Sequence, residues 1–384
     1  MRLLFTLISL LLVGLQVNGA VVNLTNKSEI YLLTCSSGEE LYSVFGHSAI
    51  RVKDDSLGYD YVFNYGTFDF DTPNFYGKFM NGDLKYKLSY TDYERFIYSY
   101  KNDGRGVSSG KLELTLRERQ ELWCLLVENI QPQNRFYRYD FFFDNCATRI
   151  RDIVFKVKGL DKEAYTKSSG ATYRDYLHAL AGKTSWKSHG VDLVLGIKAD
   201  RVASYYDRAY MPLYLDSLFH QAGLITSEKE VIPQKKTSDE NFLDVFTPNC
   251  FSLLLFTLSL LIFIIEIYCK HYIKFYDIIV FTVALLVGGL LLYLGLFTKH
   301  TITEWNLNCL WASIVYLPTI YFIVLMGKKK YALHGLHVIA IINNAFLIVL
   351  ILLSMFEVQM LPMMAYPIAG ALFIRNMSIY RFTR

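Results

Sequence analysis

Apolar residues are concentrated in the last third of the chain, where they form five nearly uninterrupted runs. Each run approaches the roughly 20 residues that a helix needs to cross the hydrocarbon core of a bilayer. We therefore expect an all-α membrane domain of five transmembrane helices, at Cys250–Tyr268, Tyr276–Phe297, Trp305–Met326, His337–Phe356 and Val358–Ile374. Pro362 and Pro367 interrupt the last run, so a hairpin that dips into the membrane is the alternative for the last two runs.

The first 20 residues show a different apolar pattern. One arginine precedes the run Leu3–Leu15, and small residues follow it, which is the order of a secretory signal peptide. The run is shorter than a membrane span, although an uncleaved anchor helix is the alternative. The predicted organisation is a signal peptide (1–20), an exported domain (21–230), a linker (231–249), the membrane domain (250–374) and a tail (375–384).

Basic residues predict the orientation of the membrane domain. Eight of them follow the first, third and fifth apolar runs: Lys270, Lys274, Lys328, Lys329, Lys330, Arg375, Arg381 and Arg384. Only Lys299 lies in the loops on the other side. This positive-inside asymmetry places the C-terminus in the cytoplasm and residues 21–247 outside, which agrees with the signal peptide.

Residues 21–230 have the mixed pattern of an α+β domain. Apolar and polar residues alternate, with many β-branched and aromatic side chains, in the predicted strands Glu29–Thr34, His47–Lys53, Tyr59–Tyr65 and Leu84–Ser89. Predicted helices cover residues 91–102, 115–130, 172–181 and 211–222, and another helix starts at Cys146. Thr115 and Glu118 have the spacing of a capping box at the start of the second helix.

Composition excludes several classes of protein. Of 384 residues, 53% are hydrophobic and only 19% are charged, below the roughly 25% usual in soluble domains. A net charge of +4 without a basic cluster in a polar stretch argues against a nucleic-acid partner. Neither CxxC nor HExxH occurs, so no metal and no cofactor are implied.

Two short segments carry candidate thiol chemistry. His47 begins a predicted strand after Gly46, and Cys146 opens a predicted helix after Asn145. The free N–H groups of a helix N-terminus lower the pKa of a thiol and favour thiolate. Such a nucleophile needs a base and a group that orients the base, and Asn64 on the next predicted strand is placed to orient His47. A structural role in packing is the alternative for both residues.

These residues occur in an order that resembles a known family. A strand histidine followed by a cysteine that opens a helix is similar to the circularly permuted papain-like (NlpC/P60, LRAT-like) hydrolases and acyltransferases. Four segments more specifically resemble the Lnb-type lipoprotein N-acyltransferases: TCSSGE (34–39), FGHSAIR (45–51), FNYGTFDF (63–70) and DNCATR (144–149). That family joins a periplasmic domain to five membrane helices, so the expected fold is a permuted papain-like α+β domain followed by an all-α membrane domain.

The resemblance implies an enzyme of the bacterial inner membrane that transfers a fatty acyl chain. Phospholipid is the donor, the α-amino group of a diacylated lipoprotein is the acceptor, and a thioester on Cys146 is the intermediate. The alternatives are a phospholipid or cell-wall hydrolase that uses the same residues, and a membrane receptor or scaffold without enzymatic activity. The expected catalytic residues are Cys146, His47 and Asn64.

Other residues have supporting or structural roles in this interpretation. Asn145 and Tyr65 lie in the resemblance motifs and are expected to support the site or bind substrate. Cys35 supports the site, is a second reactive thiol, or pairs with Cys124. Arg149 pairs with Asp152, one turn away, or with a neighbouring part of the chain, or it contacts a lipid head group. Glu266, Asn343 and Asn344 lie within apolar runs, where hydrogen bonds between helices are the expected use.

Overall fold

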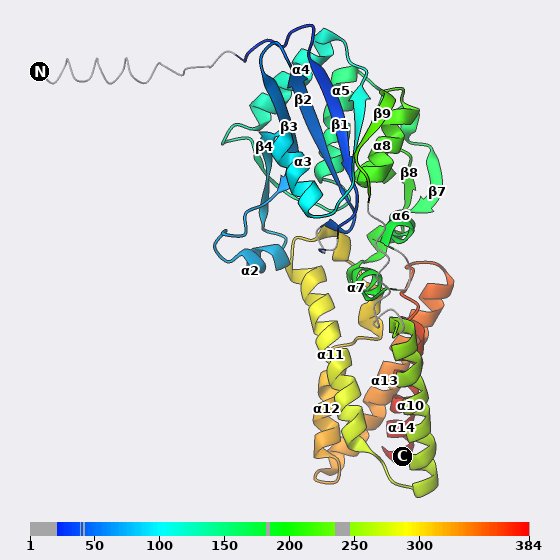
Figure 1. The fold of residues 1–384 in the computed structure, drawn as a ribbon. Helices are drawn as coiled ribbons and strands as arrows, with labels where there is room; N and C mark the ends of the chain where they lie inside the picture. The colour runs from blue at the N-terminus through cyan, green and yellow to red at the C-terminus, as the bar shows by residue number, and fades with distance from the viewer. Residues whose placement is uncertain (1–20, 39, 41–42, 182–184, 235–245, 384) are drawn as a thin grey trace, which may run out of the picture.

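The computed structural model describes residues 21–38, 40, 43–181, 185–234 and 246–383. The predicted signal peptide lies outside the described residues, as do residues 235–245 of the predicted linker. An α+β domain built on one large sheet stands at one end of a group of long helices (Figure 1). The expected division into a sheet-containing N-terminal part and an apolar helical part is confirmed.

A seven-stranded antiparallel sheet organises the N-terminal domain, in the order β6-β4-β3-β2-β1-β5-β9. The four predicted strands are present close to their expected bounds, as β1 (Glu29–Cys35), β2 (His47–Asp54), β3 (Tyr59–Thr67) and β4 (Lys85–Asp92). The aromatic segment Phe136–Phe143 is predicted to be extended, and its first residues form β6 (Phe136–Arg138). Alternation missed two strands of this sheet, β5 (Val107–Leu112) and β9 (Ile225–Ile232). β5 contains Ser, Ser, Gly and Lys in succession, and the middle of β9 is exposed on both faces, so neither has a one-sided apolar pattern.

Helices cover the two faces of the sheet unequally. Apolar side chains of α4 (Leu116–Asn129), α5 (Cys146–Lys158) and α8 (Pro212–Gln221) build the main core, and α3 (Tyr93–Asn102) closes a smaller one opposite. Alternation along β2 separates the cores, because Ile50 lies in the main core and Ala49 in the smaller one. Thr115 and Glu118 form the predicted capping box of α4.

Smaller elements connect the sheet domain to the helices below it. They are α2 (Phe75–Met80), α6 (Tyr173–Ala181), α7 (Trp186–Val194) and the strand pair β7 (Ser168–Thr172) and β8 (Val202–Ser204). Short 3-10 helices occur at Lys162–Tyr165, Ile197–Asp200, Asp207–Tyr210, Thr301–Thr303 and Leu307–Leu310. α2 and α7 lie at the level where the sheet domain meets the long helices (Figure 1).

The C-terminal part contains α10 (Pro248–Cys269), α11 (Lys274–Phe297), α12 (Tyr316–Leu325), α13 (Lys330–Met355) and α14 (Ala365–Thr383). Among the described residues, α10, α11 and Tyr331–Met355 are long and apolar enough to cross a membrane. The third predicted run differs, because 3-10 turns occupy its first half and only the ten residues of α12 are α-helical. The fifth run forms a helix that starts after Pro362 and continues beyond Ile374.

A fully buried ion cluster joins three of these helices. Arg375 on α14 donates to Asp277 on α11 at 2.5 Å and to Glu266 on α10 at 2.8 Å. The Ser378 hydroxyl also donates to Glu266. The expectation that Arg375 belongs to a cytoplasmic tail is therefore wrong, because its charge is neutralised between the helices. Glu266 therefore forms hydrogen bonds between helices, as expected. Asn343 does so too, because its side-chain amide donates to the Thr319 hydroxyl on α12.

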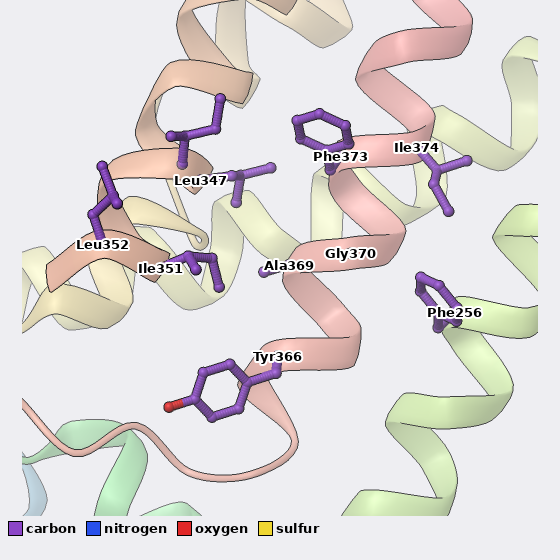
Figure 2. A pocket seen from close by; sticks show the side chains of 10 residues that line it. Phe256, Leu347, Ile351, Leu352, Tyr366, Ala369, Gly370, Phe373 and Ile374 are labelled. Atoms are coloured by element: carbon purple, nitrogen blue, oxygen red, sulfur yellow. The ribbon is translucent and has the colours of Figure 1, made fainter. Parts of the chain in front are cut away.

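An apolar cavity of about 400 Å³ lies between α10, α13 and α14 (Figure 2). Its wall includes Phe256, Leu347, Ile351, Tyr366, Gly370 and Phe373. These residues come from the half of each helix that is nearer to the sheet domain (Figure 1). The cavity therefore lies in the half of the helical part that adjoins the candidate site described below.

Polar contacts fasten the sheet domain to the helices. The buried Gln359 amide, in the loop before α14, donates to the Leu195 carbonyl at 3.1 Å. Asn306 donates to the Leu193 carbonyl at 2.7 Å, and Lys198 pairs with Glu304 at 2.9 Å. Buried polar groups require such partners, so these contacts favour one relative placement of the two parts.

Arg375→Leu is expected to destabilise the protein, because it leaves two carboxylates buried without a counter-charge. Breaking a buried ion network in this way costs about 3–5 kcal/mol. The measurement is the thermal unfolding midpoint of the purified full-length chain in detergent micelles. Arg381→Leu, at an exposed position on the same helix, is the matched control and should shift the midpoint little. Equal midpoints in the two variants would contradict the linking role of Arg375.

Candidate active site

The candidate site lies where β1 ends and β2 begins, at the end of the sheet nearest the long helices (Figure 1). Cys35 is the last residue of β1 and pairs in register with His47, the first residue of β2. Gly46 has φ of 81°, and a Cβ there would lie 2.6 Å from the Cys35 carbonyl oxygen. Because only glycine fits this turn, Gly46 determines where β2 starts and where the imidazole lies.

His47 is oriented by Asn64, as the sequence predicts. The His47 Nε2 atom lies 3.3 Å from the Asn64 Oδ1 atom, and Asn64 is buried. The Asn64 amide nitrogen donates to the Val62 carbonyl, so its oxygen faces the ring. An amide oxygen only accepts, which makes Nε2 the protonated nitrogen and Nδ1 the basic one. Burial lowers the pKa of His47 to about 4, so the ring is neutral at pH 7.

Cys146 is the first residue of α5, and Asn145 caps that helix, again as predicted. The Asn145 side-chain oxygen accepts from the backbone N–H groups of Ala147 and Thr148, each at 2.9 Å. The Thr148 hydroxyl accepts from the Asn145 backbone N–H at 2.7 Å, and the Asn145 amide donates to the Tyr210 carbonyl at 2.8 Å. Asn145 is therefore a structural cap that fixes the backbone on both sides of the thiol.

The Cys146 thiol is enclosed rather than open to solvent, with 7% of the residue exposed. Burial raises the pKa of the Cys146 thiol, and backbone N–H groups of Ser48 and Ala147 at the sulfur oppose that rise. The expectation of a net lowered pKa is wrong, because desolvation of a thiolate outweighs the N–H groups of the helix start. Gly66 lies against the thiol, since a Cβ there would be 3.6 Å from the Cys146 Cβ.

His47 and Cys146 lie at the same end of the sheet but approach it from different faces. Alternation along β2 puts His47 on the face of Ala49, which belongs to the smaller core, whereas Cys146 belongs to the main core. In the part of the chain that the structure describes, no hydrogen bond joins the His47 ring to the Cys146 sulfur. The structure thus brings the imidazole and its orienting amide together, and the backbone N–H of Ser48, the residue after His47, interacts with the Cys146 sulfur.

Cys35 is a second buried thiol at this site, on the His47 side of the sheet. Burial raises the pKa of Cys35 to about 12, although a hydrogen bond with Tyr100 and the charge of Arg105 oppose the rise. Cys35 and Cys124 are both free thiols, so the alternative disulfide between them is not formed. Cys124 instead accepts from the Gln120 amide at 3.3 Å.

Arg105 is a site residue that sequence reasoning missed. It follows α3 and donates to the Ser36 carbonyl through Nε at 3.0 Å and Nη2 at 2.8 Å. Its guanidinium also lies 4.7 Å from the centre of the Tyr100 ring. Its positive charge favours ionisation of both Cys35 and Cys146 and disfavours protonation of His47. Only the three-dimensional fold reveals this, because Arg105 belongs to none of the recognised motifs.

Arg149 and Tyr65 brace the segment that leads into α5. Arg149 forms a two-point ion pair with Asp144 at 2.5 and 2.8 Å and lies over the Tyr137 ring at 3.5 Å. Of the expected partners, Asp152 is wrong and the neighbouring part of the chain is confirmed, because Asp144 faces the guanidinium directly. Tyr65 is fully buried and packs edge-on against Tyr137. Asp152 accepts instead from the neighbouring Arg151 and from Tyr206.

One surface cluster in the described residues has groups that metals bind. Ligand atoms of Asp216, His220 and Glu228 lie within 4.8 Å of one another, and the last two residues are exposed. Burial and the nearby Glu228 carboxylate raise the pKa of Asp216 to about 6. The cluster contains neither of the site thiols, and no step of the chemistry below is assigned to it.

The helical part contacts the segment that carries Cys146. Thr301, in the loop between α11 and α12, donates its hydroxyl hydrogen to the Asp140 carboxylate. Asp140 and Asp144 exchange two backbone hydrogen bonds of 3.0 Å, one residue before the cap of α5. A single chain of bonds therefore connects the end of a membrane-spanning helix to the candidate nucleophile.

Comparison with known proteins gives two family matches, which together cover most of the chain. Residues 22–179 match the model of the Lnb N-terminal periplasmic domain, and residues 238–384 match the model of the Lnb transmembrane domain. No curated protein and no solved structure matches the chain. The two matches follow the division into a sheet domain and a helical part, and His47, Asn64 and Cys146 all lie in the first. The chain belongs to the Lnb family and has its periplasmic and transmembrane domains.

Proposed function

We propose that this protein is a lipoprotein N-acyltransferase. It moves a fatty acyl chain from a phospholipid to the α-amino group of a lipidated N-terminal cysteine, through a thioester on Cys146. The observation that carries the proposal is the position of Cys146, which opens a capped helix beside the junction with the membrane helices. The family match supports the same assignment, because Lnb domains belong to lipoprotein biogenesis.

In the first step the Cys146 sulfur attacks the ester carbonyl carbon of the phospholipid. The His47 Nδ1 atom takes the thiol proton as the C–S bond forms, after the ring and sulfur have come within reach of each other. Apo structures commonly hold such groups further apart than the reactive complex does. Backbone N–H groups at the start of α5 stabilise the oxyanion, the ester C–O bond breaks, and His47 returns the proton to the lysophospholipid alcohol.

In the second step the lipoprotein amine attacks the thioester carbonyl carbon. An α-amino group has a pKa of about 7.7–8.0, so a useful fraction is neutral and nucleophilic at pH 7. His47 accepts a proton from the attacking nitrogen, the C–S bond breaks, and the Cys146 sulfur recovers a proton from His47. Asn64 orients the ring throughout, and we assign Cys35 a supporting position behind it.

The surroundings of Cys146 favour an amine acceptor over water. The enclosed thiol leaves little room for bulk solvent, which disfavours a phospholipid or cell-wall hydrolase that uses the same residues. The apolar cavity between α10, α13 and α14 offers a place for an acyl chain within the membrane (Figure 2). Holding the chain there avoids extraction, which costs about 0.8 kcal/mol per CH₂.

The same proposal includes a topology and a fold relationship. The sheet domain faces the periplasm, the helical domain crosses the inner membrane five times, and the C-terminus is cytoplasmic. Lys270 and Lys274 lie between α10 and the body of α11, and Lys328 and Lys329 lie between α12 and α13, which supports this orientation. The order of a strand histidine before a helix-opening cysteine supports a permuted papain-like domain.

The acyl acceptor tests the proposed function directly. Purified full-length protein in micelles, given phospholipid and a diacylated lipopeptide, is expected to release lysophospholipid and N-acylated peptide in equal amounts. Mass spectrometry of both products gives the ratio, and protein carrying Cys146→Ala is the control. Release of free fatty acid with no N-acylated peptide would support the hydrolase instead.

Cys146→Ala should abolish the acyl-enzyme, because the variant lacks the attacking sulfur. Incubation of the parent with phospholipid and no amine should add one fatty-acyl mass to the Cys146 peptide, and hydroxylamine should remove it. Cys35→Ala is the matched control, since it removes the other buried thiol of the site, and it should keep most of the labelling. Labelling that is lost with Cys35→Ala and kept with Cys146→Ala would identify Cys35 as the nucleophile.

The reactivity of resting Cys146 should depend on pH as that of a buried thiol does. The pKa of Cys146 is raised and that of His47 is lowered to about 4, so the resting site holds a neutral thiol and a neutral imidazole at pH 7. Alkylation of Cys146 by iodoacetamide without lipid should accelerate about tenfold per pH unit, with no plateau below about pH 8.5. Peptide mass spectrometry measures the rate, and a plateau starting below pH 7 would reveal a resting thiolate–imidazolium pair.

A further inference from the structure

An aromatic segment, residues 68–82, projects from the sheet domain between β3 and β4 and includes α2 (Figure 1). Its apolar side chains are exposed to an unusual degree, with 61% of Phe70 and 78% of Tyr76 accessible. Phe79 and Met80 are exposed as well. Soluble domains seldom leave contiguous apolar groups uncovered, so this segment has the surface of an interaction site.

The aromatic segment is fastened to the outer end of α11. Tyr293 donates its hydroxyl hydrogen to the Asn81 side chain, and the Lys299 backbone N–H donates to the Asn81 carbonyl at 2.9 Å. Lys299 also pairs with Asp83 at 2.5 Å, and His300 Nε2 lies 3.1 Å from the Met80 carbonyl oxygen. These contacts hold the segment at one fixed height relative to the membrane helices.

The length and composition of α11 predict that its end lies at the surface of the bilayer, and the segment lies at the same height. From Ile278 to its end at Phe297, α11 contains no charged residue, and the residues that hold the segment (Tyr293, Lys299 and His300) lie at this end or just after it. Aromatic side chains gather at this level in membrane proteins, where a ring is buried among lipids while its polar groups stay hydrated. Asp69, Asp71 and Lys78 give the segment no excess of positive charge, so the attraction is to apolar lipid and not to anionic head groups.

A row of rings leads inward from the aromatic segment. The Phe68 ring centre lies 5.0 Å from that of Phe70 and 5.7 Å from that of Phe75. On its other side Phe68 is 5.4 Å from Tyr86 on β4, and Tyr86 stacks on Tyr139 at 4.5 Å. The row therefore continues from the exposed segment into the sheet domain without a gap between rings.

The row ends at the candidate nucleophile. Tyr139 lies against Gly66, where an added Cβ would be 3.5 Å from the ring and 3.6 Å from the Cys146 Cβ. Only Thr67, the last residue of β3, separates Gly66 from Phe68. The end of β3 therefore lies close both to Cys146, through Gly66, and to the exposed aromatic segment, through Phe68. Burial raises the pKa of Tyr139 well above its ordinary value, which keeps the phenol neutral and the surroundings of the thiol apolar.

We propose that residues 68–82 enter the outer layer of the membrane, and that Phe68, Tyr86 and Tyr139 guide a phospholipid acyl chain from the bilayer to Cys146. The proposed membrane contact depends only on the exposed apolar side chains of the segment and on its position at the end of α11. The guiding role rests on the proposed acyl transfer, because it needs an acyl chain that reacts at Cys146. The partner is a lipid surface, and its recognition does not depend on head-group charge.

Depth-dependent quenching tests the membrane contact without any reaction. Full-length protein carrying Tyr76→Trp, reconstituted in vesicles of brominated phosphatidylcholine, should lose much of the fluorescence that the substitution adds. Parent protein in the same vesicles supplies the background of its own four tryptophans. Leu116→Trp is the matched control, since Leu116 is exposed at the opposite end of the sheet. Equal quenching of the two added signals would overturn the membrane contact.

A comparison of two acyl donors tests the guiding role. The double variant Tyr76→Glu/Phe79→Glu should acylate Cys146 roughly tenfold more slowly with bilayer phospholipid, because it replaces two lipid-facing rings by charges. Its rate with a water-soluble short-chain ester should fall much less, and Leu116→Glu should change neither rate. An equal fall with both donors would overturn the guiding role. No acyl-enzyme with either donor in the parent would instead overturn the proposed function, while the quenching result still decides the membrane contact.

Discussion

The Asn145 cap of α5 is the interaction on which the arrangement of the site depends. Its side-chain oxygen satisfies two free N–H groups of the helix start, its backbone N–H donates to the Thr148 hydroxyl, and its side-chain amide donates to the Tyr210 carbonyl. Cys146 follows it directly, so the cap fixes the sulfur beside the Ser48 N–H and the close approach of Gly66. Because Asp144, one residue earlier, is bonded to Asp140 and through it to Thr301, the same short segment also carries the connection to the membrane helices.

Burial determines the protonation states of the two residues in the proposed chemistry. Desolvation raises the pKa of the Cys146 thiol and lowers that of His47, so the resting site holds two neutral partners rather than an ion pair. A neutral site is compatible with an apolar acyl chain as substrate. A permanent ion pair would need water around it, and an acyl chain would displace that water at a cost in free energy. Arg105 offsets part of the desolvation penalty by favouring ionisation of the thiol, and two hydrogen bonds to the Ser36 carbonyl fix its position. The thiolate is then favoured only when substrate and base come together.

How much the sequence predicts depends on whether the signal is local. The strand that begins at His47, the Asn145 cap and the Asn64 partner were predictable, because turns, caps and alternation are encoded within a few residues. Arg105 and the partner of Arg375 were not, since each depends on segments far apart in the chain. β9 was missed because most of its residues are exposed. The third run was mispredicted as one long helix, and in its first half Asn306 and Asn308 donate through their side chains to the Leu193 carbonyl. The net pKa of Cys146 was mispredicted for the same reason, because burial is a property of the fold.

The membrane sets the final constraint on how such a site works. A long acyl chain leaves a bilayer at a cost of about 0.8 kcal/mol per CH₂, so a periplasmic thiol reaches it cheaply only if the chain stays in apolar surroundings throughout. The sheet domain meets this requirement by its attachment, since Gln359, Asn306 and Thr301 bond it to the outer ends of the helices. An apolar cavity among the helices and a row of aromatic rings in the sheet domain then lie on the two sides of that junction. In the proposed reaction, therefore, only the ester group has to reach the level of Cys146, while most of the lipid remains in the membrane.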